Sequence, residues 1–193
     1  MNGCLGSIDS RRSIRDLSGE VSDEALETIL HAGARAPSPH NTQPWRFVVL
    51  GQRSKLKLAD LMYRKYIDRF KNEPGAEEKA AKLRKRLRDA PLAILLCLDR
   101  SRIRSSAGRE MIEWLMATQS LAAVAENMWL AARSVGLDAM WIAAPLAIGD
   151  HMRYELGLGY SLEPQILMAF GRRSKEPGPK QELGWRELAM FLE

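Results

Sequence analysis

The sequence has few of the side chains that build disulfide frameworks, metal centres or membrane anchors. Its 193 residues include two cysteines, Cys4 and Cys97, which make neither a disulfide framework nor a cysteine-rich metal cluster. The longest apolar runs, over residues 92–98 and 139–148, are much shorter than a membrane span. The first residues lack the basic-then-apolar pattern of an export signal. We therefore expect a cytoplasmic protein with no membrane partner.

The common signatures of hydrolytic and phosphate-handling enzymes are also absent. There is no G-x-S-x-G nucleophile elbow, no P-loop and no H-E-x-x-H zinc motif. The three histidines, His31, His40 and His151, are scattered and have no cysteine or carboxylate at ligand spacing. These absences argue against a metal site and against a serine nucleophile.

The basic surplus of the chain is confined to one stretch. Lysine and arginine number 29 against 24 aspartates and glutamates, so the net charge is +5. Between Arg64 and Asp89 there are ten basic and five acidic residues, which accounts for the whole surplus. One hypothesis is therefore a polyanion binder that uses this stretch. Because acidic residues are interspersed and only Tyr66 and Phe70 are aromatic, the stretch lacks the pattern of a nucleic-acid stacking platform.

Apolar periodicity predicts helices and strands that alternate within one domain over residues 1–193. Hydrophobic residues make up 46% of the chain, which suits a single sizeable core. Helical spacing is found over residues 21–35, 54–70, 76–88, 108–135 and 150–156, and more weakly over 185–192. Strand patterns are found over residues 46–50, 93–98, 139–143 and 165–170. This interleaving predicts a layered α/β or α+β fold.

Two polar clusters carry candidate chemistry. The first, Arg11-Arg12-Ser13-Ile14-Arg15, places three guanidinium groups and a hydroxyl within five residues. Such groups match a phosphate dianion if they converge on it, although a solvated basic segment would have the same composition. The second, residues 36–47 (APSPHNTQPWRF), is a proline-rich loop with two carboxamides. Carboxamides both donate and accept, which suits the edge of a heterocycle, but they also stabilise ordinary turns.

Together these motifs resemble the nitroreductase family of flavin enzymes. The order RRSIR, a capped helix and APSPHNTQPWRFVV carries the resemblance, and DAPLAILL and ARSVGLDAMWIAAP follow in family order. The resemblance covers nearly the whole chain. It implies an α+β fold with a central mixed sheet flanked by helices, in an intertwined homodimer with two FMN sites at the subunit interface.

The resemblance also implies which residues hold FMN. The R-x-S-x-R segment grips the phosphate and ribityl chain, and the second loop comes from the other subunit to line the isoalloxazine ring. The chain after GLDAMW offers a backbone N–H to flavin N5, and a cation of the C-terminal tail completes the phosphate site, with Lys180 the best match and Arg172 and Arg173 as rivals. The expected cofactor-binding residues are Arg11, Arg12, Ser13, Arg15, Ser38, Pro39, His40, Asn41, Gln43, Arg86, Ala143, Ala144 and Lys180.

The implied activity is hydride transfer from NADH or NADPH through flavin N5 to a nitroaromatic, a quinone or a similar small acceptor, by a ping-pong mechanism. Because the flavin carries the chemistry, no catalytic side chain is expected. Departures from the family pattern at Pro39-His40, Ala143-Ala144 and Glu182 indicate a different pocket floor and different phosphate ligands. Two alternatives stay on the same fold: a flavin or deazaflavin domain of coenzyme F420 metabolism, with a basic pocket from Arg84, Lys85, Arg86 and Arg88, and an enzyme that fragments FMN.

Overall fold

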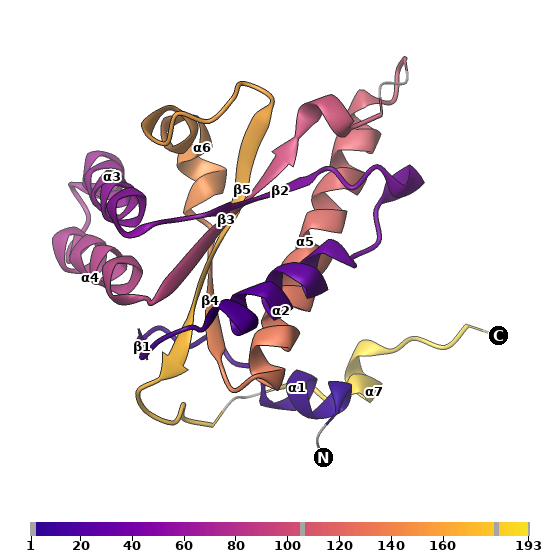
Figure 1. Cartoon of the computed structure of the whole chain (residues 1–193), viewed down its shortest axis with the longest axis horizontal. Coiled ribbons are helices and arrows are strands. Elements are labelled where there is room, and N and C mark those ends of the chain that lie inside the picture. The colour runs from indigo at the N-terminus through magenta and orange to yellow at the C-terminus, as the bar shows by residue number, and fades with distance from the viewer. Residues whose placement is uncertain (1–2, 105–106, 180–181, 193) are drawn as a thin grey trace.

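The chain folds around a central five-stranded sheet in the computed structural model, which describes residues 3–104, 107–179 and 182–192 (Figure 1). The strands are β1 (Leu17–Ser18), β2 (Trp45–Val49), β3 (Leu92–Asp99), β4 (Asp138–Ile142) and β5 (Leu162–Arg173). β5 pairs with β1, β3 and β4, and β2 pairs with β3, each time antiparallel. A parallel bridge between Ser13 and Ala139 makes the sheet mixed.

Helices cover both faces of this sheet. They are α1 (Cys4–Ser10), α2 (Asp23–Ala34), α3 (Gln52–Phe70), α4 (Ala76–Asp89), α5 (Glu110–Ser134), α6 (Ala144–Glu155) and α7 (Trp185–Leu188), with short 3-10 turns η1 (Pro39–Asn41) and η2 (Arg100–Arg102). Figure 1 shows α2 and α5 on one side of the sheet and α3, α4 and α6 on the other. The predicted α+β class is therefore confirmed. Among the helices that the structure describes, none is both long and apolar enough to cross a bilayer.

The protein has one hydrophobic core on each face of the sheet, and the central strand β3 contributes side chains to both. All eight of its residues are buried, because successive side chains point to opposite faces and each face is covered. Ile94 and Leu96 pack in the cluster that includes α2 and α5 residues. Leu95 and Cys97 pack in the cluster on the side of α3, α4 and α6. The continuous apolar run in the sequence thus marks a strand buried on both faces.

Local signals determine where several helices begin and end. The Oγ atom of Ser22 accepts a hydrogen bond from the N–H of Ala25 at 3.2 Å and caps α2 as predicted. Gly136 follows α5 with φ of 77°, a conformation that glycine adopts without steric cost.

The prediction of a helix over residues 150–156 is wrong in its start, since α6 already begins at Ala144. Pro145 lies in the first turn, where its missing N–H costs nothing, and Ile148 has non-helical angles that interrupt the apolar spacing. The elements α1 and β1 are absent from the sequence-based prediction, because α1 buries none of its residues and β1 has only two.

Candidate functional site

A cavity of about 540 Å³ lies where β4 runs into α6, beneath α3 and α4. This volume is within the range of small-molecule sites, which hold roughly 300–1,000 Å³. Its walls are mainly apolar and aromatic, with a few polar groups. The lining residues are Ser13, Arg15, Met62, Lys65, Tyr66, Arg69, Phe70, Leu83, Arg86, Met140, Trp141, Ile142, Ala143, Ala144, Ala147 and Ile148.

Five of the predicted cofactor-binding residues meet at this cavity: Ser13, Arg15, Arg86, Ala143 and Ala144. The bridge from Ser13 to Ala139 of β4, together with the 3.1 Å bond from the N–H of Ile14 to the carbonyl of Ala139, holds the N-terminal segment against the sheet here. Ala144 opens α6, and the first N–H of a helix has no partner within the helix. Pro145 has no N–H, and the N–H of Leu146 donates to the carbonyl of Ala143 at 3.1 Å. A hydroxyl, two guanidinium groups and a helix N-terminus therefore surround an apolar space.

The guanidinium groups of Arg11, Arg12 and Arg15 do not meet at one place in the single chain. The Nε atom of Arg11 lies 3.1 Å from a carboxylate oxygen of Glu126, and its guanidinium stacks on Trp129 at 4.8 Å from the ring centroid. Arg12 donates to the carbonyl of Gly178 at 2.9 Å. Arg11 ends α1, whereas Arg15 follows the bridge of Ser13 to β4, and only Arg15 of the three lines the cavity.

The loop of residues 38–43 has a strained backbone that hydrogen bonds hold in place. His40, Asn41 and Gln43 have φ values of 52°, 53° and 48°, a region that residues other than glycine rarely adopt. The N–H of Gln43 donates to Oγ of Ser38 at 3.0 Å, and the side-chain amide of Gln43 donates to Oδ1 of Asn41 at 3.1 Å. Such strain persists at functional sites where the surroundings enforce it.

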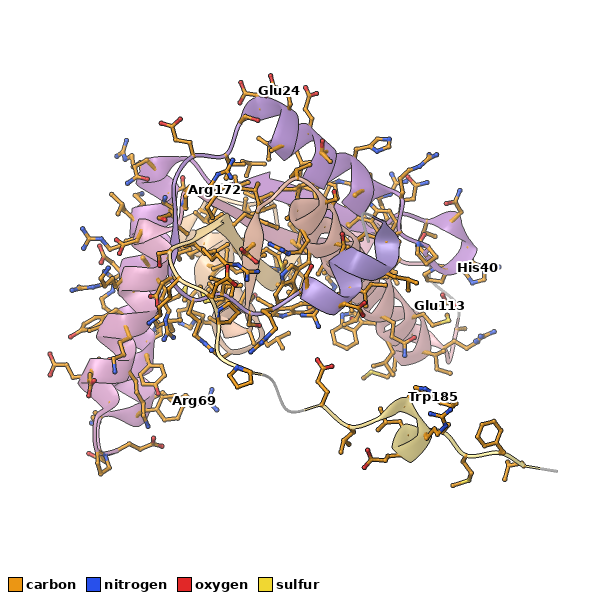
Figure 2. All side chains as sticks on the ribbon, turned by 90° about the horizontal axis from the view of Figure 1, so that it is seen from below. Glu24, His40, Arg69, Glu113, Arg172 and Trp185 are labelled. Atoms are coloured by element: carbon orange, nitrogen blue, oxygen red, sulfur yellow. The ribbon has the colours of Figure 1, made fainter. Side chains whose placement is uncertain are left out.

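This loop does not line the cavity of its own chain. Figure 2 shows His40 beside Glu113 on one side of the molecule and Arg69 on the opposite side. Nε2 of His40 lies 3.7 Å from the carboxylate of Glu113, a buried residue of α5. The side chains of His40, Asn41 and Gln43 are all exposed. Within a single chain, the loop of residues 38–43 therefore lies apart from the cavity that holds the other predicted cofactor-binding residues.

Arg172 and Arg173, the alternatives to Lys180 as the cation of the phosphate site, do not line the cavity either. Arg173 makes two hydrogen bonds to the buried carboxylate of Asp138, at 2.8 and 2.7 Å, and these bonds hold the pKa of Arg173 above its ordinary value. Arg172 lines a separate pocket with Glu20 and Ser22. Lys180 lies outside the described residues.

The expected basic pocket of Arg84, Lys85, Arg86 and Arg88 does not form as a unit. Arg84 lies 3.7 Å from Asp60, and Lys85 pairs with Asp89, so among these four only Arg86 lines the cavity. At about 100° per helical residue, Arg86 lies on the opposite side of α4 from Arg84 and Arg88, so the four cations cannot share one face.

Sequence reasoning missed the contribution of α3 to the cavity. Met62, Lys65, Tyr66, Arg69 and Phe70 all line it, and their spacing of three and four residues marks one helical face. The helical spacing in the sequence predicts the apolar residues of this face. Lys65 and Arg69 entered the sequence analysis only through the net charge of residues 64–89.

Among the described residues, no cysteine lines the cavity, and the nearby core residue Cys97 is buried. Burial raises the pKa of the Cys97 thiol to about 12, so the thiol stays protonated at neutral pH. Within residues 3–104, 107–179 and 182–192, no three histidine, cysteine or acidic side chains come together as metal ligands.

Comparison with known proteins identifies the family. The model of the nitroreductase family matches residues 8–172. A relative from Archaeoglobus fulgidus, named as an NADH dehydrogenase/NAD(P)H nitroreductase, is 33% identical over 143 residues, which are 74% of this chain and 68% of that protein. A protein of the same name from Methanothermobacter thermautotrophicus is 31% identical over 138 residues, 71% of this chain and 59% of that protein.

A solved structure has the same fold over the full length. It is a nitroreductase from Desulfovibrio desulfuricans in complex with FMN, with a TM-score of 0.79 and 26% identity, and the match covers 100% of this chain and 98% of that chain. The family match takes in the bridge of Ser13, the strained loop and the start of α6. The chain belongs to the nitroreductase family.

Proposed function

We propose that this chain is a single-domain, cytoplasmic FMN-dependent NAD(P)H oxidoreductase. The observation that carries the proposal is the joint placement of Ser13, Arg15, Arg86 and the start of α6 around one cavity. FMN, when bound, takes a hydride from NAD(P)H at N5 and passes two electrons to an oxidised acceptor such as a nitroaromatic or a quinone. The relatives named as NAD(P)H nitroreductases and the FMN-bound neighbour support this assignment.

The residues of the cavity suit FMN chemically. The hydroxyl of Ser13 and the guanidinium groups of Arg15 and Arg86 would bind its anionic and carbonyl groups with charge-assisted hydrogen bonds. The N–H of Ala144 at the start of α6 offers a donor with a partial positive charge, which would stabilise negative charge in the ring system. Met140 and Ile142 of β4 offer an apolar surface for a planar ring. This chain therefore binds and polarises the cofactor without an acid or base of its own.

A second copy of the chain would complete the site. The strained loop of residues 38–43 exposes its carboxamides on the side away from the cavity, where another chain can take them up. The C-terminal segment extends from the body in Figure 2 and exposes large apolar side chains. These are Leu183, Trp185, Leu188, Met190, Phe191 and Leu192, each at least 61% exposed. Exposed apolar surface of this extent favours association, and a homodimer is its commonest form.

The single apolar cavity supports a mechanism in which the two substrates bind in turn. The reductant would leave before the acceptor binds, and the kinetics would be ping-pong. We expect purified protein to show flavin absorption bands, to release FMN on denaturation and to give parallel double-reciprocal plots with a nitroaromatic acceptor. Protein that takes up no FMN, or that turns over no acceptor, would overturn the proposal.

A further inference from the structure

Four cations face the cavity without an acidic partner. Lys65 and Arg69 lie one turn apart on α3 and join Arg15 and Arg86 in the lining, and none of the lining residues is a carboxylate. Each of these four side chains also lacks an ion pair with any residue in the described ranges. Four like charges around a low-dielectric space raise the local concentration of anions.

Neighbouring cations on α4 behave differently. Lys82 pairs with Glu78 one turn away, and Lys85 pairs with Asp89. The guanidinium of Arg84 lies 4.5 Å from the ring of Tyr63 and 3.7 Å from the carboxylate of Asp60. These three cations are thus partnered outside the cavity, whereas the cations that line it are not. The ion pairs of the described residues also leave out four cations away from the cavity: Arg64, Lys71, Lys79 and Arg88.

The cofactor accounts for only part of this charge. In the proposed function, Arg15 and Arg86 bind FMN, which leaves Lys65 and Arg69 for another ligand. Both come from the helix that also supplies Tyr66 and Phe70, whose ring centroids are 4.7 Å apart. Lys65 is half-buried and Arg69 is exposed, so the two can meet a ligand as it enters. Neither cation has a carboxylate partner in the described chain, but Arg69 does have an aromatic one, because its guanidinium lies 5.4 Å from the ring centroid of Phe70. Aromatic side chains beside such cations suit a ligand that is an aromatic ring with a negative group.

We propose that Lys65 and Arg69 are specificity-determining residues. They select an electron acceptor whose aromatic ring carries a reducible group, such as a nitro group, together with an anionic group, such as a carboxylate. This inference rests on the proposed function of the cavity. The cations bind the anionic group, and Tyr66 and Phe70 contact the ring. The electron transfer is the same as in the proposed function, because NAD(P)H supplies both electrons that reduce the acceptor.

The test compares two acceptors of nearly equal shape, 4-nitrobenzoate and the neutral 4-nitrobenzamide. Their affinities for the oxidised FMN-loaded enzyme are measured without reductant, by flavin difference absorbance and by calorimetry. We expect the carboxylate to bind at least about tenfold more tightly in low salt, and this preference to shrink as ionic strength rises. The double variant Lys65→Gln/Arg69→Gln should remove the preference and leave 4-nitrobenzamide within about twofold of its original affinity. Lys79→Gln, an exposed lysine of α4 outside the cavity, is the matched control.

The outcomes separate this inference from the proposed function. Equal affinity for both compounds in the parent, or an equal loss of both in the double variant, contradicts a role in anion selection. A double variant that raises the KM for NADPH but not for NADH, while the preference for 4-nitrobenzoate persists, assigns the cations to the reductant and also overturns the proposal. Failure of the proposed function would instead appear as purified protein that binds no FMN. In that case, calorimetry with 4-nitrobenzoate on the parent and the double variant still shows whether Lys65 and Arg69 bind the carboxylate.

Discussion

The cavity beside β4 and the loop of residues 38–43 differ in how each is stabilised. The cavity is open, and its cations have no carboxylate partners among the described residues. The loop is closed on itself by bonds between Ser38, Asn41 and Gln43, and three of its residues adopt left-handed angles. The cavity is thus built to receive charge, whereas the loop is built to present fixed polar groups. One chain holds them on opposite sides, so a site that contains both, as we propose, needs two chains.

The largest effect is expected from removing a cavity cation. Arg15→Gln should weaken FMN binding about tenfold to a hundredfold, because a charge-assisted hydrogen bond contributes roughly 1.5–3 kcal/mol. A fluorescence titration of FMN into apoprotein measures the change, with Lys79→Gln as the control variant. Unchanged affinity in Arg15→Gln would show that this guanidinium does not hold the cofactor.

A smaller effect is expected in the loop, and it concerns stability. Gln43→Val should lower the free energy of unfolding by about 1–2 kcal/mol more than Gln43→Gly does, because a β-branched residue tolerates a positive φ poorly and glycine tolerates it freely. Both variants lose the side-chain bond to Asn41, so the difference isolates the backbone. Urea unfolding measures both, and equal stabilities would mean that the left-handed conformation is not maintained.

The smallest effect concerns the buried thiol beneath α3. With its pKa raised to about 12, Cys97 has roughly one thiolate per ten thousand molecules at pH 8, so a disulfide reagent should modify only the exposed Cys4 of the folded protein. Urea should then expose Cys97 and double the number of reactive thiols. Rapid modification of Cys97 in native buffer would contradict the packing of this core.

Much of the fold could be predicted from the sequence because single residues carry local signals. Ser22 before an apolar helical face, the run from Leu92 to Leu98 and Gly136 after α5 each mark an element through capping, burial or backbone freedom. The short elements α1 and β1 carry no such signal, because tertiary contacts and not local preference form them.

The site could be predicted only in part, for a reason of geometry. Ser13, Arg15, Arg86, Ala143 and Ala144 meet as the family resemblance implied. Arg11 does not join them, because it ends α1 and its guanidinium contacts Glu126 and Trp129 of α5, which the sequence pattern did not predict. Lys65 and Arg69 were missed because a net charge does not record which face of α3 a cation occupies.

The central claim is that each site combines the cavity of one chain with the loop of another, and mixed dimers test it most directly. One variant, Arg15→Gln/Arg86→Gln, disables the cavity, and the other, Asn41→Ala/Gln43→Ala, disables the loop. Co-expression with two different tags isolates dimers that contain one chain of each kind. If the halves come from different chains, one of the two sites in such a dimer is intact, so it should bind about half the FMN of the unmodified dimer. If each chain builds its own site, the mixed dimer should bind as little FMN as either variant alone, and the account would be wrong.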